Sequence, residues 1–415
     1  MKQAAPALAK WPPDSPSDPA APQALLLTVL AYLPCILGMM TIGVIVPFID
    51  VLSGSFAVSR SDIGFSIAVF SIPTALLATV GGGLADRYGV RRCLLASVLL
   101  TAAGSLLASR VHSILALDCA IATAGAGFGG AAVNGPALLM RALSGPLRTR
   151  AISFLSTYPP TGYAAGLLLA VPFTATDDWR SALQIQTGLL LAIWLLLLWL
   201  LPRRVVRSEE AQHLSLRSSL AGTLSVIRQS RVLRLAVSVA LINAVAYGTS
   251  LAIPSYLAHV QHLTLATSST AVASAKIAAM IIGGLSMGYL LSRAVSVILM
   301  FSTMAAIGFA AQAALFLPSH GLALATGALV VWLFAFGGMS GGAMSLLPIV
   351  VGDPSRSGAA SGVVNQFISV VSFAAPSIWL ALASGPQFVL LAGACLLVSL
   401  LALPWRNSVT RRLAD

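Results

Sequence analysis

The sequence alternates between long apolar runs and short polar segments. Each run stays apolar for 18 or more residues, close to the roughly 20 residues that a helix needs to cross a hydrocarbon core about 30 Å thick. Strands of a membrane barrel would instead alternate apolar and polar positions over about ten residues. The pattern therefore predicts an all-α membrane protein with 12 transmembrane helices, at 24–49, 64–84, 93–110, 113–140, 151–173, 181–201, 233–257, 267–291, 294–317, 321–350, 358–384 and 386–404.

Composition excludes an ordinary soluble domain. Hydrophobic residues make up 58% of the 415 residues and charged residues only 9%, against roughly 25% charged residues in soluble domains. The four cysteines, which fall inside predicted spans and lack the spacing of metal ligands, are expected to be small apolar packing residues without disulfides. They are Cys35, Cys93, Cys119 and Cys395.

Basic residues gather on one side of the predicted membrane. With the N-terminus inside, 20 of the 24 lysines and arginines fall in cytoplasmic segments, Arg60, Arg110 and Arg180 fall outside, and Lys276 lies within a span. This asymmetry follows the positive-inside rule. The net charge of +12 is therefore explained by topology and by attraction to anionic lipid, and it does not indicate a nucleic-acid partner.

The two ends of the chain are expected to be cytoplasmic tails. Residues 1–22 are Pro-rich and polar and lack the apolar core of a secretory signal, so this tail is predicted to be disordered. Residues 405–415 form the second tail. Together with the charge pattern, these features predict a multi-pass protein of a bacterial inner (cytoplasmic) membrane.

Landmarks in the first half of the chain recur in the second. At an offset of 206, Gly82 and Arg87 fall on Gly288 and Arg293, and at an offset of 207, Pro47 falls on Pro254. Such spacing predicts a duplicated unit, with a six-helix bundle at 23–201 and another at 233–404. The joint at 202–232 has apolar residues at helical spacing beside arginines, which favours an amphipathic helix on the cytoplasmic surface over a solvated linker. These apolar residues are Leu216, Leu220, Leu224 and Ile227.

A charged motif interrupts the apolar pattern between the second and third spans. It reads GGGLADRYGVRRCLL at 81–95 and resembles the loop signature of the major facilitator superfamily, G-x-x-x-D-R-x-G followed by a basic pair. Val90 places the pair one residue later than in the commonest form. The matching residues are Gly82, Asp86, Arg87, Gly89, Arg91 and Arg92.

The resemblance covers 24–404 and has two weaker elements, DDWRSAL at 177–183 and the glycine run GAGFGG at 125–130. It implies two pseudo-repeated six-helix bundles around a central site. It also implies that Asp86 meets the N-terminus of the eleventh helix, around 357–360, as a conformational latch, because a helix N-terminus carries positive dipole charge. For Arg91 and Arg92, a role as topology anchors is the alternative.

Ionisable residues inside a membrane span are costly and mark functional sites by default. Lys276 lies roughly 14 Å into the eighth span at 1.5 Å per residue and is the candidate for binding an anion or coupling to protons; the alternative is a snorkelling or structurally paired cation. Asp118 in the fourth span is the candidate proton carrier, or else lies at the outer mouth. Asp50, at the end of the first span, is expected to cap and be solvated.

Several uncharged polar residues also fall inside spans, and each is as readily explained by helix-to-helix hydrogen bonding as by ligand contact. These candidates are Tyr32, Asn134, Tyr158, Asn243, Tyr247, Trp332, Asn365 and Gln366.

The pattern favours a secondary transporter that works by alternating access. The five histidines lie at span ends or loops, so no catalytic or metal site is expected, and the absence of a phosphate-binding loop motif disfavours ATP-driven transport. Proton-driven export of a small organic solute, such as a drug or a metabolite, is the first hypothesis. Uptake of a small organic anion or zwitterion by proton symport is the alternative, because the antiporter glycine-proline signature is not intact at 156–166. We expect a monomer without cofactors, with the proton gradient as energy source.

Overall fold

The described part of the chain is helical. The computed structural model describes residues 21–404, apart from breaks at 144–146, 148–150, 153, 156, 202–228, 293–294, 317–320, 348–349, 351–356 and 383–385. Its helices follow the twelve predicted spans in order, which confirms the predicted fold class. The predicted tails and most of the predicted surface helix lie outside the described residues.

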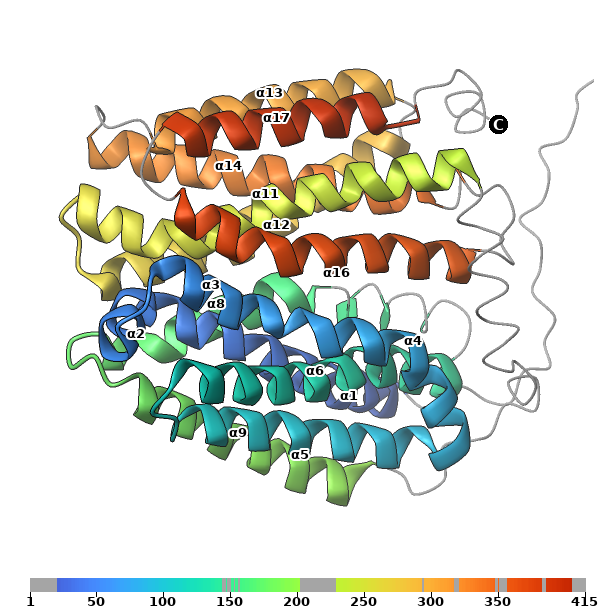
Figure 1. The fold of residues 1–415 in the computed structure, drawn as a ribbon. Helices are drawn as coiled ribbons and strands as arrows, with labels where there is room; N and C mark the ends of the chain where they lie inside the picture. The colour runs from blue at the N-terminus through green and yellow to red at the C-terminus, as the bar shows by residue number, and fades with distance from the viewer. Residues whose placement is uncertain are drawn as a thin grey trace, which may run out of the picture.

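Two groups of helices form the two halves of the molecule (Figure 1). The first half contains α1 (Ala21–Ile45), η1 (Val46–Phe48), α2 (Ile49–Phe56), α3 (Arg60–Val69), α4 (Ser71–Tyr88), α5 (Val90–Ala108), α6 (Ile114–Ala142), α8 (Tyr158–Ala170), η2 (Val171–Phe173) and α9 (Trp179–Leu200). The second half contains α11 (Ser230–Val260), α12 (Leu265–Ser292), α13 (Val297–Phe316), α14 (Leu322–Ser345), α16 (Ser357–Ala381) and α17 (Pro386–Ala402).

Nine of the described helices are long and apolar enough to cross a bilayer. The other three predicted spans correspond to shorter helices: α3 with α4, α8, and the 17-residue α17. The second span is divided after Val69 because Pro73 has no N–H to offer the carbonyl four residues earlier. Pro47 similarly interrupts the first span, where the chain tightens into η1.

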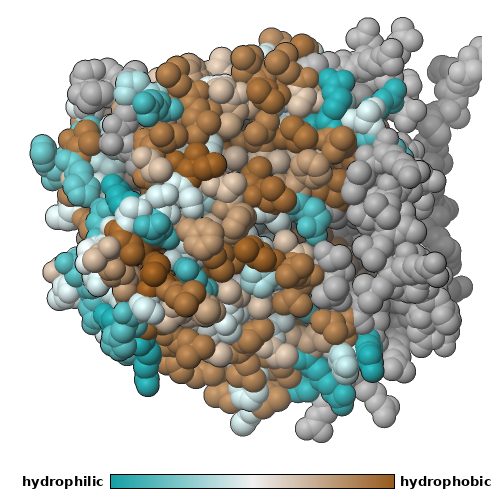
Figure 2. All heavy atoms as spheres, viewed as in Figure 1, coloured by the Kyte–Doolittle hydropathy of each residue, from teal (hydrophilic) through white to brown (hydrophobic). Residues whose placement is uncertain are grey.

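The sides of the molecule are apolar, as a lipid-facing surface requires. Figure 2 shows hydrophobic residues over most of the visible face and hydrophilic residues mainly toward its two ends. Large side chains such as Leu76, Trp199 and Leu285 are exposed on this surface. We call the end where α2, α3 and the α11–α12 turn meet the outer end, because the charge pattern predicts that it faces outside.

Small residues bring the helices close together. In the glycine run of α6, a Cβ at Gly125 or Gly129 would meet Phe70 or Thr74, whereas one at Gly127 or Gly130 would meet α5. The run therefore packs α6 between two neighbouring helices. In a membrane there is no hydrophobic driving force between helices, and small residues favour their association by letting the backbones approach closely.

Each half contains a buried hydrogen-bond network around a glutamine. In the first half, Gln186 donates to Thr41 (2.8 Å) and accepts from Ser105 (3.1 Å). In the second, Gln312 donates to Thr249 (3.0 Å). Ser105 and Gln312 differ by 207 positions, the offset found between the proline landmarks, but the glutamine lies on α9 in the first network and on α13 in the second. The two networks are therefore similar in kind and not equivalent residue by residue.

Candidate functional site

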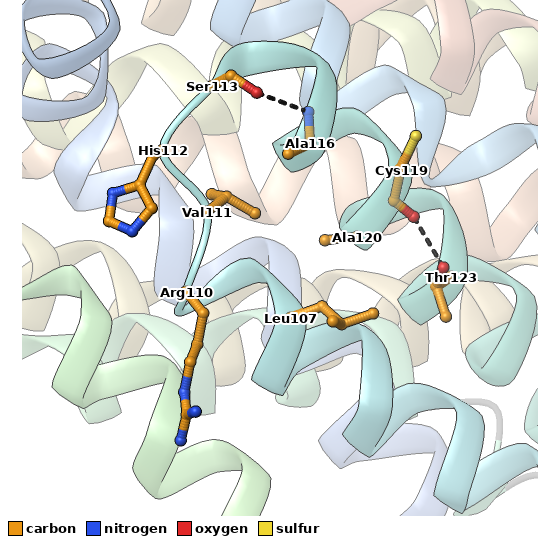
Figure 3. A pocket seen from close by; sticks show the side chains of 9 residues that line it. All are labelled: Leu107, Arg110, Val111, His112, Ser113, Ala116, Cys119, Ala120 and Thr123. Atoms are coloured by element: carbon orange, nitrogen blue, oxygen red, sulfur yellow. Dashed lines mark hydrogen bonds between the residues drawn. The ribbon is translucent and has the colours of Figure 1, made fainter.

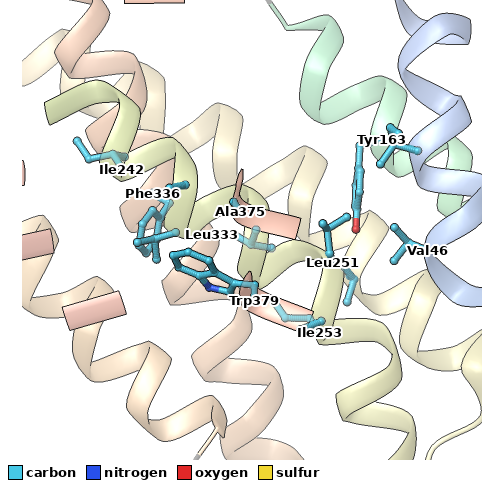
Figure 4. Close-up of a cluster of buried hydrophobic side chains, with 14 of the residues drawn as sticks. Val46, Tyr163, Ile242, Leu251, Ile253, Leu333, Phe336, Ala375 and Trp379 are labelled. Carbon is cyan, nitrogen blue, oxygen red and sulfur yellow. The ribbon is translucent and has the colours of Figure 1, made fainter. Parts of the chain in front are cut away.

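The two halves meet through side chains that bond to backbone atoms of the opposite half. At the outer end, the Ser61 hydroxyl of α3 donates to the Ser377 carbonyl oxygen of α16 (3.0 Å). Deeper in the bundle, the Tyr163 hydroxyl of α8 donates to the Ser250 carbonyl oxygen of α11 (2.7 Å). Figure 4 shows Tyr163 beside Val46 of η1, facing Leu251 of α11 within one buried cluster. The outer end of the interface is therefore closed.

Lys276 lies at the contact between the halves. It is the twelfth residue of α12, about 16 Å from the start of that helix at 1.5 Å per residue. Its Nζ donates to the Ser250 hydroxyl (2.8 Å) and stands 4.0 Å from the centroid of the Tyr163 ring. Only 7% of the residue is exposed. The same two residues, Ser250 and Tyr163, thus join the halves to each other and hold the lysine.

The charge of Lys276 is not neutralised within the described chain. Among the described residues no carboxylate forms an ion pair with it, Asp118 included. Its contacts are a hydroxyl and an aromatic face, and the Ser250 hydroxyl already donates to the Ala246 carbonyl oxygen (2.6 Å). A buried cation usually has a charged partner, and an ammonium at this position has none among the described residues.

Aromatic and hydroxyl groups join α8 to its neighbours within the first half. The Tyr32 hydroxyl bonds to Thr157 (2.8 Å) and Thr161 (3.3 Å), which ties α1 to α8. Tyr158 packs its ring edge-on against Phe128, with centroids 5.9 Å apart. On α11, the Asn243 amide donates within its own helix to the Val239 carbonyl oxygen (2.8 Å), and Tyr247 follows one turn later as a partly buried residue.

Two buried oxygens on α6 lack partners among the described residues. Asp118 is half-buried, and its Oδ1 makes no hydrogen bond. Asn134 is buried and donates to the Gly130 carbonyl oxygen (2.7 Å), while its Oδ1 is unpartnered. Since buried polar atoms are usually satisfied, both oxygens are open to a proton donor or a ligand.

The sequence profile of the Major Facilitator Superfamily matches residues 29–376. The chain belongs to this superfamily. The resemblance carried by the 81–95 motif is thereby confirmed, and members of the superfamily are transporters, not enzymes.

Three curated superfamily proteins share shorter segments with this chain. The cephamycin export protein CmcT of Amycolatopsis lactamdurans is 36% identical over 31% of this chain and 28% of its own length. Protein spinster homolog 3 of Danio rerio is 30% identical over 35% of this chain and 30% of its own. The inner membrane transport protein YajR of Escherichia coli is 27% identical over 48% of this chain and 43% of its own. Each match therefore spans less than half of the relative.

Solved structures match almost the whole fold. A bacterial homologue of the human lysosomal transporter Spinster, in an inward-facing and occupied conformation, has a TM-score of 0.73 at 15% identity and covers 95% of this chain and 98% of its own. The xylose transporter XylE from E. coli, in an inward open conformation, has a TM-score of 0.72 at 16% identity, with 92% and 96% covered. At these identities the likeness establishes the fold alone.

The superfamily motif is described only in part. Gly89 ends α4 with a φ of +88°, a conformation that favours glycine. Arg91 caps the end of α9 by donating to the carbonyl oxygens of Leu201 (3.0 Å) and Leu198 (2.8 Å). The side chain of Asp86, the surroundings of Gly82 and the side chains of 357–360 lie outside the described residues, so the predicted latch stays a prediction. Arg87 and Arg92 are exposed.

Three other predicted site residues have different surroundings. Trp332 is fully buried, donates to Gln312 (2.6 Å) and packs on Phe336, which makes it part of the core of the second half. Gln366 donates across the interface to the Ala75 carbonyl oxygen of α4 (3.4 Å). Asn365 has an exposed side chain on α16.

Several interface residues were not predicted from the sequence. Tyr163 and Ser250 look like ordinary span residues, and nothing in the apolar pattern indicates which face they occupy. The sequence placed Arg60 only among the basic residues outside the membrane. In the structure it forms an ion pair with Asp50 (3.0 Å) and donates to Ser255 of the other half (2.7 Å). The available signal was the presence of two opposite charges, Asp50 and Arg60, within ten residues at the end of the first span.

A separate hollow of about 560 Å³ lies between α5 and α6 at the outer end (Figure 3). Its lining includes Leu107, Arg110, His112, Cys119 and Thr123, and none of the predicted site residues. It is not part of the site around Lys276.

Proposed function

We propose that this superfamily member is a proton-coupled secondary transporter that exports a small organic solute by alternating access. The superfamily match supports transport, and one of the three relatives is named as an export protein. The two-half architecture supports rocking of one half against the other around a central site. The transporter acts as a monomer in a bacterial inner membrane, with cytoplasmic termini and without a cofactor.

Lys276 is the solute-binding or proton-coupling residue of this proposal. The observation that carries it is the unmatched charge: a buried ammonium at the contact of the halves, held by Ser250 and Tyr163 and paired with no described carboxylate. A cation at membrane depth costs about 3 kcal/mol on insertion scales. An anionic group on the solute, bound when the halves separate, supplies the missing counter-charge.

Asp118 is the proton carrier in the same proposal. Its unpartnered Oδ1 leaves room for a proton to be bound and released without breaking another hydrogen bond. Proton binding at Asp118 and solute binding near Lys276 each neutralise a charge that the membrane interior disfavours, and in the export proposal they belong to opposite steps of the transport cycle.

Uptake of a small organic anion or zwitterion by proton symport is the second candidate. The same observation favours it, since an unmatched ammonium attracts an anion whichever way the solute moves. The two candidates differ in the sign of the coupling: solute moves against the proton flux in export and with it in uptake.

Transport in proteoliposomes under an imposed proton gradient tests the proposal. Labelled anionic, zwitterionic and cationic solutes are compared in both gradient directions for the wild type and for Lys276→Ala, Lys276→Arg and Lys276→Met. Thr270→Ala, an exposed position on the same helix, is the matched control. We expect Lys276→Ala and Lys276→Met to lose coupled flux, Lys276→Arg to recover part of it because the guanidinium is larger and does not titrate usefully, and Thr270→Ala to match the wild type. Unchanged flux in Lys276→Ala ends the role proposed for this residue.

The latch belongs to the same proposal and has its own test. Asp86→Asn removes the charge that meets a helix N-terminus but keeps nearly the same volume. We expect normal insertion and folding with a lower transport rate, whereas Thr270→Ala, at an exposed side chain outside the motif, changes the rate little. Wild-type transport in Asp86→Asn contradicts the latch.

A further inference from the structure

Four side chains form a charged cluster across the outer end of the interface. Asp50 of α2 pairs with Arg60 of α3 (Nε to Oδ1, 3.0 Å), and the other end of the guanidinium donates to the Ser255 hydroxyl of α11 (Nη2 to Oγ, 2.7 Å). His259 of α11 directs Nε2 toward the second oxygen of Asp50 at 4.0 Å. Asp50 and Arg60 belong to the first half, and Ser255 and His259 to the second.

The hydrogen bond on the other side of the imidazole fixes its tautomer. Nδ1 of His259 lies 2.7 Å from the Ser255 carbonyl oxygen, and a carbonyl oxygen can only accept. Nδ1 therefore carries the hydrogen, and the neutral ring presents a lone pair on Nε2 to the Asp50 carboxylate. Protonation of Nε2 turns this facing pair from two acceptors into an imidazolium and a carboxylate.

The other charged groups near this cluster are engaged elsewhere or lie beyond it. Asp62 of α3 accepts from the Ser59 backbone N–H (2.9 Å) and from the Ser59 hydroxyl (2.7 Å) in a capping box. His262 lies in the turn after α11 with an exposed side chain. Within the described residues, the outer ends of α12, α14, α16 and α17 carry no acidic or basic side chain, and His320, before α14, lies outside them. The charge opposite His259 is thus that of Asp50 with its partner Arg60.

We propose that His259 is a proton-binding site that regulates the outer gate, so that acidity outside favours the outer-closed conformation. The proton comes from outside water and adds to Nε2; no bond other than N–H is formed. The added ion pair joins the two halves and exists only while they are in contact. Closure is therefore favoured while the imidazole is protonated, and this contribution is lost when the ring is neutral.

This site differs from the proton carried by the transporter. His259 is two-thirds exposed at the outer end, so it exchanges protons with the outside and does not carry them across. The inference rests on the proposed orientation and alternating access, but not on the solute or on Lys276. In an exporter driven by inward proton flow, it favours the outer-closed state when the outside is acidic.

Distance measurements between spin labels test the gate without any solute. Labels are placed on cysteines at Ser55 and Thr270, exposed positions in the two halves near the outer end, in full-length protein whose four native cysteines are replaced. In reconstituted wild type, lowering the pH from 8 to 5 should shift the ratio of outer-closed to outer-open by about two- to fivefold, the amount that one exposed ion pair provides. His259→Gln and Asp50→Asn should remove the shift.

Matched variants separate the gate from the proposed function. His262→Asn, which tolerates the left-handed backbone at that position (φ +51°), should keep the shift, as should Lys276→Ala even where it abolishes transport. His259→Arg, with a permanent cation, should show no pH response and keep the closed-to-open ratio of the wild type at pH 5. A pH response that survives in His259→Gln, or that disappears in His262→Asn, overturns the proposal, as does a wild type without a response.

Discussion

At the scale of single residues, Lys276 is a cation that is costly to place inside a membrane and that makes only two stabilising contacts. One hydroxyl and one aromatic face hold its ammonium, and a cation over an aromatic ring contributes on the order of 2 kcal/mol when desolvated. That contribution is comparable to the insertion cost of about 3 kcal/mol, so the residue gives the resting protein little net stability. We therefore expect Lys276 to contribute mainly in a state in which a further partner, such as the solute, is bound to it.

Replacing this lysine should make the protein more heat-stable. Lys276→Met keeps most of the volume and leaves no polar atom unbonded, because the Ser250 hydroxyl keeps its bond to Ala246 and Tyr163 keeps its bond to the Ser250 carbonyl oxygen. We expect the free energy of unfolding to rise by about 1 kcal/mol, the insertion cost less the lost contact with the aromatic ring, measured by thermal denaturation in detergent. A melting temperature several degrees below that of the wild type would instead show that Lys276 has a structural role.

At the scale of helices, contacts between glycines set how closely α1 and α8 approach. A Cβ on Gly43 would meet the backbone of Tyr163 and Gly166, and one on Gly166 would meet the carbonyl oxygen of Met40. Backbone atoms cannot rotate away as a side chain can, so α8 has to shift as a unit. The position of Tyr163 against the second half depends on this contact.

Gly166→Ala should therefore destabilise the protein, although alanine is the better helix former. Overpacking of this kind costs about 1 to 3 kcal/mol, which lowers the melting temperature measured in detergent. Gly188→Ala in α9 is the control, because a Cβ there meets nothing within 4 Å, and it should be neutral or slightly stabilising. Equal melting temperatures for the two variants would contradict the close packing.

The start of α9 depends on a capping carboxylate. Asp178 accepts from the Ser181 backbone N–H (3.0 Å). The pKa of Asp178 is lowered first by its side-chain interaction with Ser181 and then by this backbone bond. A lowered pKa means that the stabilisation is present at neutral pH and is lost as the pH falls through the folded-state value, below the ordinary 3.8.

Asp178→Ala should lower stability at pH 7 by about 1 kcal/mol, the usual value of an N-cap. Asp178→Asn keeps an accepting oxygen and should lose less. Thermal denaturation from pH 7 to pH 3 should show the gap between wild type and Asp178→Asn closing as the pH falls. A gap that widens with acid would exclude the carboxylate as the cap.

The sequence predicted the helices far better than the contacts between them. Spans could be placed because a bilayer imposes length and apolarity on each helix separately, and Lys276 stood out because a charge violates that rule. Its partners could not be predicted: Ser250 lies on the preceding helix and Tyr163 on a helix of the other half, and tilt and rotation decide which faces meet. Trp332 shows the same limit, since a tryptophan facing a cavity and one facing a core look alike in a sequence.

At the scale of the whole molecule, the distribution of basic residues predicts the orientation in the membrane. Both termini and residue 215 should lie in the cytoplasm, because the loops on that side carry 20 of the 24 lysines and arginines. Reporter fusions at residue 215 and after residue 404 should be active only with a cytoplasmic reporter, and a fusion at Ser113, in the α5–α6 turn, only with an external one. An external position for residue 215 would overturn this topology, and the outer gate with it.

The hydrogen bonds that join the halves have a consequence for divergence. Ser61, Tyr163 and Gln366 all donate to main-chain oxygens of the other half, and every residue type supplies such an oxygen. Mutations can therefore accumulate at the accepting positions without removing the bond, provided that the helix keeps its path. In such an interface the accepting residues can be substituted freely while the donating side chains are kept. A substitution in one half therefore does not require a compensating substitution in the other.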